Sequence, residues 1–214
     1  MGVAVHYVGV YATGALKDFG LTVVSTFLSI ILGMLAAAGR LYGPRIVQRL
    51  IGWYVELIRG LPAILQLFIL YFGLNQVGVN FSPLTAALIW LVLYGVGYAV
   101  EIFRAGIMEV AQGQREAAVA LGLSSGTTMR KIIFPQALVA MLPPLTSSVV
   151  LQLKNTTMLY LIGYADIMYQ ARLGVDATNQ AGPLYVMAAI AYLIMSFIIG
   201  RIGMRMERRA AAYR

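Results

Sequence analysis

The chain has 214 residues, of which 60% are hydrophobic and only 11% are charged, and its formal net charge is +8. Charged residues make up about a quarter of an ordinary soluble domain, so this composition is typical of an integral membrane protein. The absence of cysteine excludes disulfides, thiolate chemistry and cysteine-based metal sites, and the basic residues stand in short blocks that fit loops facing anionic lipid better than a nucleic-acid groove.

Five largely apolar segments are long enough to cross a bilayer, which needs about 20 apolar residues in helical conformation. The first of them holds 21 residues without a charge. We therefore predict an all-α integral membrane protein in which residues 1–214 form a single transmembrane domain. The predicted spans cover about residues 19–39, 51–74, 84–103, 136–154 and 178–200.

Side-chain spacing predicts how the first and third spans pack. In the third span Gly95 and Gly97 permit another helix to approach closely, and Glu101 and Arg104 lie three positions apart at its end. Four hydroxyl side chains stand at helical spacing along the first span, and we expect them to bond neighbouring helices or their own backbone: Thr22, Ser25, Thr26 and Ser29.

The second span contains charged and helix-breaking residues. Glu56 and Arg59 are three positions apart and therefore share a helix face, where they can pair. Gly60 and Pro62 follow directly and predict a kink near the membrane face.

The only long polar interruption of the chain gives a predicted cytoplasmic loop at about residues 104–131. Residues 112–121 favour a helix, and Gly122 can adopt the left-handed conformation that ends one. Ser124 or Ser125 can then cap a second helix. These features predict a rigid knob at the membrane surface.

The fourth span contains three prolines, Pro135, Pro143 and Pro144. A double proline removes backbone hydrogen bonds that lipid cannot replace. We therefore predict a broken span that faces protein or a water-filled path.

Polar residues gather at the end of this fourth span. A zwitterion that crosses the membrane needs donors for its carboxylate and acceptors for its ammonium group. Asp166 can serve such a substrate or instead pair with Lys154 or Arg172 as scaffolding. The candidate substrate-pathway residues are Gln152, Lys154, Asn155, Thr156 and Asp166.

The distribution of Lys and Arg predicts the orientation in the membrane. With five spans, twelve basic residues lie in the loops and terminus on one side, and only Lys17 and Arg172 lie on the other. The positive-inside rule then places the C-terminus and the polar loop in the cytoplasm and the N-terminus outside.

Several motifs also carry a family resemblance. The chain reads RGLP from Arg59, YAVEIFRAGI from Tyr98, GQREAAVALGLS from Gly113 and IIFPQA from Ile132. These motifs resemble those of the membrane (permease) subunits of type I ATP-binding-cassette importers, in the polar amino-acid branch that takes up histidine, glutamine, arginine or glutamate. Leu61 and Phe134 depart from the pattern, which commonly has threonine and leucine there.

The resemblance implies a type I importer permease fold and roles for two sets of residues. One set forms the loop that couples to an ATPase: Arg115, Glu116, Ala117, Ala118, Leu121 and Gly122. The other is a structural signature: Glu56, Arg59, Gly60, Pro62, Glu101, Arg104, Pro135, Pro143 and Pro144.

The resemblance also implies partners and a location. The partners are a cytoplasmic ABC ATPase dimer, which would bind ATP and magnesium, a second permease subunit, identical or homologous, and an extracytoplasmic solute-binding protein. The location is the bacterial inner membrane.

Nothing in the sequence suggests an enzyme. No lysine follows the glycine of a phosphate-binding loop, and no cluster of histidine and carboxylates suggests hydrolysis or a metal site. The chief alternative is a stand-alone secondary transporter or channel. A membrane-embedded signalling or assembly subunit is a third possibility, but it gives no reason for the polar residues at the end of the fourth span.

Overall fold

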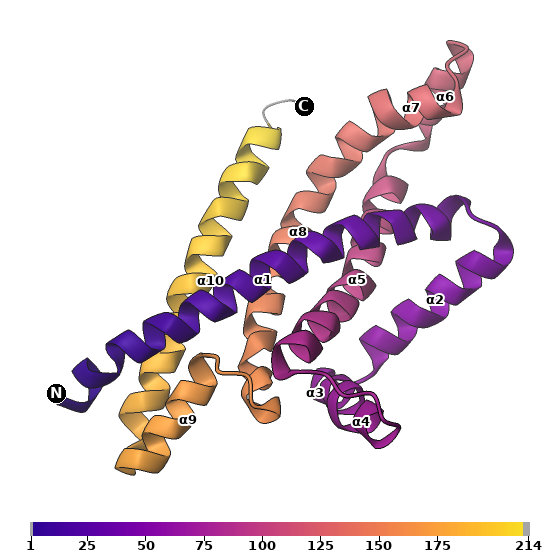
Figure 1. The fold of residues 1–214 in the computed structure, drawn as a ribbon. Helices are drawn as coiled ribbons and strands as arrows, with labels where there is room; N and C mark the ends of the chain where they lie inside the picture. The colour runs from indigo at the N-terminus through magenta and orange to yellow at the C-terminus, as the bar shows by residue number, and fades with distance from the viewer. Residues whose placement is uncertain (1, 212–214) are drawn as a thin grey trace.

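The computed structural model describes residues 2–211, and the side chains of residues 7–210 (Figure 1). Every regular element in that part of the chain is helical. The elements are α1 (Gly2–Tyr42), α2 (Arg45–Gly60), α3 (Ala63–Phe68), the π-helical turn η1 (Ile69–Gly73), α4 (Leu74–Gln76), α5 (Pro83–Glu109), α6 (Gln112–Ala120), α7 (Ser125–Thr128), the π-helical turn η2 (Met129–Ile133), α8 (Phe134–Asn155), the 3₁₀-helix η3 (Thr156–Ile162), α9 (Ile167–Thr178) and α10 (Ala181–Ala211).

Four continuous helical segments are long and apolar enough to cross a membrane, and a bent pair of helices supplies a fifth. The first of them starts well before residue 19, because α1 continues through Lys17 and Asp18. The four segments are Tyr7–Tyr42, Pro83–Glu109, Ser125–Ile162 and Ala181–Ala210.

The bent pair is the second predicted span, and its break is sharper than a kink. After Gly60 the chain is extended at Leu61, and the two halves of the span meet at 110°. The Gln66 side-chain amide donates to the carbonyl oxygens of Ile58 (2.8 Å) and Leu61 (2.9 Å). This buried amide therefore satisfies backbone oxygens at the break.

The predicted pairing of Glu56 with Arg59 is wrong, because no ion pair joins these two described residues. The Arg59 guanidinium lies over the Tyr98 ring, 5.9 Å from its centroid. Glu101 and Arg104, three positions apart, do form an ion pair, and Arg40 of α1 also donates to Glu101 Oε2 (3.0 Å). Glu101 thus holds the ends of α1 and α5 together.

Helix α5 lies between α1, α2 and α8 and forms much of the core (Figure 1). A Cβ added at Gly95 would lie 2.0 Å from Gln152 Nε2, and one added at Gly97 would lie 2.6 Å from Ile58 Cγ2. The predicted close approach at both glycines is confirmed. Ser25 and Ser29 on α1 bond to Gln152 and to the Val92 carbonyl, as expected of the first-span hydroxyls.

Gly95→Ala should lower the stability of the folded chain. The added methyl group must displace Gln152 or Ser29, and overpacking of this kind costs roughly 1–3 kcal/mol. Thermal unfolding in detergent measures this loss. Gly20→Ala is the matched control, because no heavy atom lies within 4 Å of its new Cβ and alanine favours a helix, so an equal loss there would contradict the packing argument.

The predicted break in the fourth span is wrong, because α8 runs continuously through Pro143 and Pro144. Each proline removes one backbone donor, and both residues are exposed, so their rings do not displace a neighbouring helix. Packing of α8 against α5 and α10 stabilises it as one continuous helix. Pro135 is the second residue of α8 and directly follows the π-helical turn η2, and a local π adjustment of this kind accommodates the backbone groups that a proline leaves unpaired.

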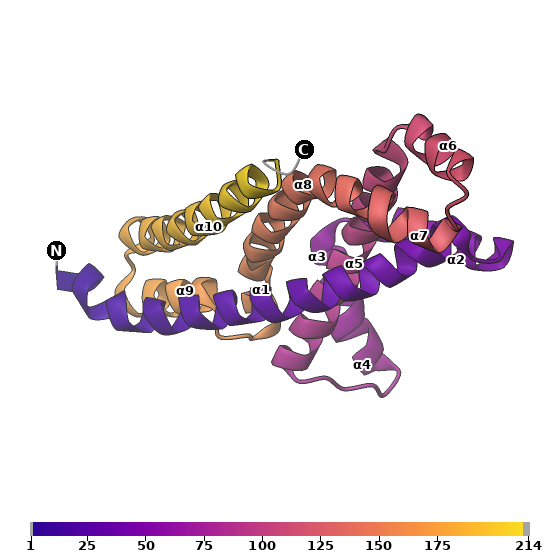
Figure 2. The ribbon, with the colours of Figure 1, turned by 90° about the horizontal axis from the view of Figure 1, so that it is seen from above.

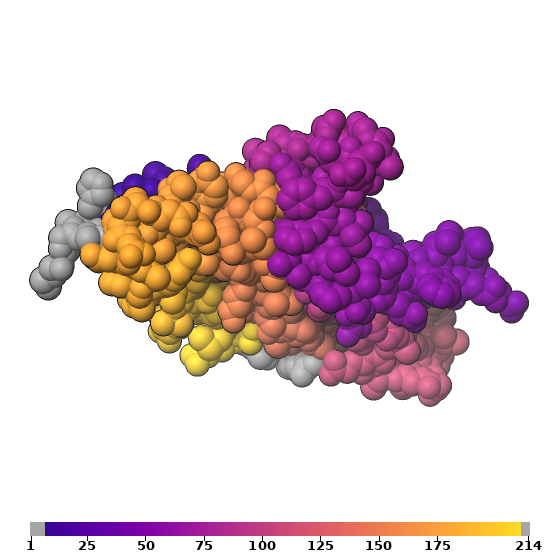
Figure 3. Space-filling model, turned by 90° about the horizontal axis from the view of Figure 1, so that it is seen from below, coloured from indigo at the N-terminus to yellow at the C-terminus, as the bar shows by residue number. Residues whose placement is uncertain are grey.

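The two ends of the bundle differ. Helix α6 projects at the end where α10 finishes (Figures 1 and 2). The opposite end holds α9 and η3 (orange) and α3 and α4 (purple), which Figure 3 shows from below. The polar loop and the polar end of the fourth span therefore occupy opposite ends of the molecule.

Candidate functional site

The first candidate site is α6 together with the turn that follows it. Gly122 has φ +69°, so it adopts the left-handed conformation that the sequence predicts. The Leu123 amide donates to the Ala118 carbonyl (3.0 Å), which closes the end of α6. Ser124 then caps α7 by accepting from the Thr127 amide (3.3 Å). These bonds fix the direction in which α6 points.

Two of the predicted coupling residues attach α6 to the bundle. The Arg115 guanidinium donates to the Ile107 carbonyl of α5 (3.0 Å), and Ala118 is only 1% exposed. Gln136 of α8 also donates to Gln114 (3.4 Å). Arg115 and Ala118 therefore act inside the chain, and the small size of Ala118 serves packing within it.

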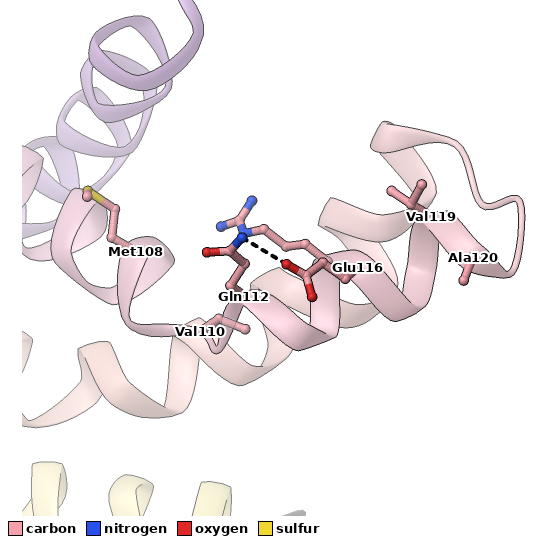
Figure 4. Close-up of a pocket in the computed structure, with 7 residues that line it drawn as sticks. Met108, Val110, Gln112, Glu116, Val119 and Ala120 are labelled. Carbon is pink, nitrogen blue, oxygen red and sulfur yellow. Dashed lines mark hydrogen bonds between the residues drawn. The ribbon is translucent and has the colours of Figure 1, made fainter.

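The other predicted coupling residues face outward. Leu121 is 76% exposed, and Glu116 and Ala117 are exposed as well. Val119, which the sequence analysis did not single out, is also exposed, at 73%. Figure 4 shows the Glu116 carboxylate accepting from the Gln112 side-chain amide (2.8 Å), with Val119 further along the same helix. Such a mixture of exposed apolar side chains with one carboxylate is typical of a surface that packs into a groove of another protein.

A pocket of about 730 Å³ separates α6 from the end of α5, and its lining includes Met108, Val110 and Glu116 (Figure 4). A second pocket of about 500 Å³ also borders α6, sharing Arg115 and Val119 with the first and lined in part by Tyr42 and Met129. Two hollows therefore adjoin α6, although Arg115 and Ala118 attach it to the bundle. A partner can contact α6 in both hollows.

The second candidate site is the polar end of the fourth span, and most of its residues are buried. Gln152 accepts from Ser25 Oγ (2.8 Å) and donates to Ser29 Oγ (3.3 Å). Thr156 is buried and donates to the Leu153 carbonyl (2.8 Å), whereas buried Asn155 has an Nδ2 atom without a partner among the described residues. This cluster mainly joins α1 to α8.

Lys154 alone of the five predicted substrate residues is exposed. It lines a groove of about 600 Å³ between α8 and α10, together with Pro143, Ser147 and Glu207. The Thr146 hydroxyl donates to Glu207 Oε1 (3.2 Å). The groove therefore carries a cation and a carboxylate along a face of α8.

Asp166 is fully buried and pairs with neither Lys154 nor Arg172, so both predicted ion pairs are wrong. Its Oδ1 atom accepts from the Tyr169 amide (2.6 Å) and caps α9. Arg172 instead pairs with exposed Asp176 one helical turn away (3.1 Å).

Sequence reasoning missed Asp18, which is fully buried on α1. Its Oδ2 atom accepts from the Tyr192 hydroxyl of α10 (2.9 Å) and from the Ile167 amide of α9 (3.2 Å). The spacing of polar residues in the sequence could have revealed it. Asp18 lies four positions before Thr22, on the same helix face as Thr22, Ser25 and Ser29. Asp18 extends that polar stripe and joins three helices.

The free energy of unfolding of the chain should fall as pH rises towards 8, because of the buried pair of acids Asp18 and Asp166. Burial, together with the nearby Asp18 carboxylate, raises the pKa of Asp166 to about 7 from an ordinary value near 4. The folded chain therefore holds a proton that the unfolded chain has lost, which stabilises it below neutral pH, and that gain is lost as pH passes through 7.

Thermal unfolding at pH 5.5 and pH 8 tests this linkage. The expected loss in the unfolding free energy is about 2 kcal/mol over that interval. Asp166→Asn keeps the cap and should flatten the dependence, whereas the control Asp176→Asn, in an exposed pair, should not. Equal slopes in all three proteins would contradict the shared burial of Asp18 and Asp166.

Comparisons with known proteins place this geometry in a family. Residues 29–211 match the family described as "Binding-protein-dependent transport system inner membrane component". The chain is 31% identical to the glutamine transport system permease protein GlnP of Escherichia coli (strain K12), over 92% of this chain and 90% of that protein. It is 34% identical to the arginine transport system permease protein ArtQ of Bacillus subtilis (strain 168), over 88% and 87%.

Solved structures agree with these relatives. An amino acid ABC transporter crystallised with histidines has a chain that superposes with a TM-score of 0.91 at 31% identity, covering 96% of each chain. The methionine transporter MetNI, in an inward-facing conformation, superposes with a TM-score of 0.79 at 19% identity, covering 95% of this chain and 97% of its own, and shows the shared fold. This chain therefore belongs to the family of binding-protein-dependent transport system inner membrane components, as a permease-type membrane subunit.

Proposed function

We propose that this chain is the transmembrane subunit of an importer of polar amino acids, and that a separate ATPase drives it through α6. The observation that carries the proposal is the exposed apolar pair Val119 and Leu121 on a helix that Arg115 and Ala118 fix to the bundle. A helix that is held rigidly but exposes apolar side chains at a polar end suits docking to a soluble partner.

The same contacts supply a route from the partner to the spans. Helix α6 packs on η2, and η2 continues without interruption into α8. Helix α8 in turn packs against α5 and α10. A movement of α6 is therefore passed to three membrane helices as a displacement of packed side chains.

The orientation follows from charge. Among the described residues, eleven basic side chains lie on the α6 side in the loops and along the end of α10, against Lys17 and Arg172 on the other. We place α6 and the C-terminus in the cytoplasm, and the N-terminus and α9 outside.

For the substrate, we propose Lys154 as the group that receives the carboxylate of an amino acid. It opens on the groove between α8 and α10, whereas the other four candidates are buried: Gln152, Asn155, Thr156 and Asp166. Curated relatives named for glutamine and arginine transport support a polar amino acid as the substrate class.

The partners in this account are a cytoplasmic ABC ATPase dimer, a second permease subunit, identical or homologous, and an extracytoplasmic solute-binding protein. ATP and magnesium bind to the ATPase. Glu116 faces the ATPase from α6, beside Ala117. Membership in a family of binding-protein-dependent systems supports this assembly.

Reconstitution into vesicles tests the proposal against a stand-alone secondary transporter. With the ATPase and the binding protein present, uptake should require ATP and magnesium and should persist when ionophores collapse every ion gradient. Uptake by the chain without the ATPase, driven by a gradient, would contradict the proposal.

A further inference from the structure

A pocket lined by arginines lies at the end of α5 that leads to α6. It has a volume of about 420 Å³ and is bounded by the end of α1, the start of α2 and α5. The α1–α2 turn beside it projects from the bundle (Figures 1 and 3). The lining residues are Arg40, Leu41, Arg45, Gln48, Arg49 and Arg104.

The charges around this pocket do not balance. Glu101 is the one carboxylate that the described structure pairs with its arginines, and it accepts from Arg40 Nη1 (3.0 Å) and Arg104 Nε (3.0 Å). Arg45 and Arg49 have no carboxylate partner among the described residues. Four guanidinium groups therefore share one acid, which leaves a site that attracts anions.

The face of α2 next to these arginines is apolar and exposed. Trp53 on this face is 72% exposed. Val55 and Ile58 lie on a different face of α2, which is buried in the core. Helical spacing places the apolar stripe beside Arg45 and Arg49 and away from the buried face. The stripe consists of Ile46, Leu50, Trp53 and Leu57.

We propose that this pocket binds the phosphate group of an anionic phospholipid whose acyl chains lie along the stripe on α2. A guanidinium presents paired donors that match phosphate oxygens. Glu101 holds Arg40 and Arg104 in place, and Arg45 and Arg49 have donors left for the phosphate. The adjoining apolar stripe favours a lipid over a free phosphate, because only a lipid uses both features.

Fluorescence quenching by brominated lipids tests this site directly. The chain has two tryptophans, of which Trp53 lies on the stripe and Trp90 is buried. The full-length chain is placed in vesicles of unlabelled phosphatidylcholine that contain a minor fraction of brominated phosphatidylglycerol or of brominated phosphatidylcholine. A Trp53→Phe chain supplies the background from Trp90.

We expect brominated phosphatidylglycerol to quench Trp53 more strongly than brominated phosphatidylcholine does. The double variant Arg45→Gln/Arg49→Gln should lower that preference by about tenfold, since each basic residue near anionic lipid contributes a several-fold preference. The control Arg208→Gln/Arg209→Gln, which removes exposed arginines of α10, should keep it.

Three outcomes would overturn the lipid assignment. Equal quenching by the two lipids in the unaltered chain would show no anionic preference. An excess that survives in Arg45→Gln/Arg49→Gln would place the preference elsewhere. If millimolar inorganic phosphate at constant ionic strength abolishes the stronger quenching by brominated phosphatidylglycerol, the pocket binds free phosphate. If the stronger quenching persists, the lipid assignment is supported.

Discussion

Gly122→Val should lower ATP-driven uptake by about tenfold to a hundredfold while the chain still inserts and assembles. Gly122 has φ +69°, a conformation in which a β-branched residue is a strong outlier. Nothing lies within 4 Å of an added Cβ, so the effect comes from the backbone and not from a clash. Relief of strain worth roughly 1–3 kcal/mol would turn α6 away from its docking direction.

Two substitutions make this prediction specific. Gly122→Asn should retain most of the uptake, because asparagine tolerates the left-handed region. Gly126→Val adds the same side chain in the first turn of α7, where the new Cβ also meets nothing within 4 Å and the backbone has no positive φ. Uptake is measured with the assembled complex in vesicles. Normal uptake by Gly122→Val would remove the turn from the coupling route.

Lys154→Met should lower uptake at limiting substrate by about ten- to a hundredfold. A charge-assisted hydrogen bond to a substrate carboxylate is worth roughly 1.5–3 kcal/mol in a partly desolvated site. Lys154 is exposed on the groove and makes no ion pair among the described residues, so its replacement leaves no buried charge behind.

The concentration dependence of uptake distinguishes a binding role from a structural one. Lys154→Met should raise the substrate concentration for half-maximal uptake, and Lys154→Arg should restore most of the affinity. Basal ATPase activity should stay near that of the unaltered complex. A loss of assembly, or unchanged uptake at every concentration, would remove Lys154 from the substrate path.

The sequence predicted well those features that depend on local backbone geometry. The glycine turn at Gly122, the cap at Ser124 and the close contacts at Gly95 depend on a few neighbouring residues or on the absence of a side chain. Their conformations follow from steric rules that hold in any fold. These local features could therefore be predicted without knowledge of the tertiary structure.

Tertiary packing decided the features that the sequence could not predict. Pro143 and Pro144 predict a broken helix, but contacts with α5 and α10 keep α8 continuous. Arg59 turns to Tyr98 of α5 instead of Glu56, because a ring on another helix lies within reach. Residue spacing within one helix identifies neither the helices that pack against α8 nor the Tyr98 ring that Arg59 contacts.

The buried acids show the same limit. Asp166 was predicted to meet a substrate or a cation, yet it caps α9 and lies near Asp18, 148 positions away in the chain. Asp18 itself stands at the start of an apolar segment and so resembles a flanking charge. Its role depends on Tyr192 of α10, which only the fold brings beside α1.

Photo-crosslinking can detect the proposed contact between α6 and the ATPase. Since the chain contains no cysteine, Leu121→Cys and Val77→Cys each provide a single site for a benzophenone maleimide. Both side chains are largely exposed, at 76% and 74%, but Val77 follows α4 at the opposite end of the bundle. In the assembled complex, illumination should link position 121 to the ATPase and leave position 77 unlinked to it. Failure of position 121 to link, or equal linking from position 77, would contradict the account.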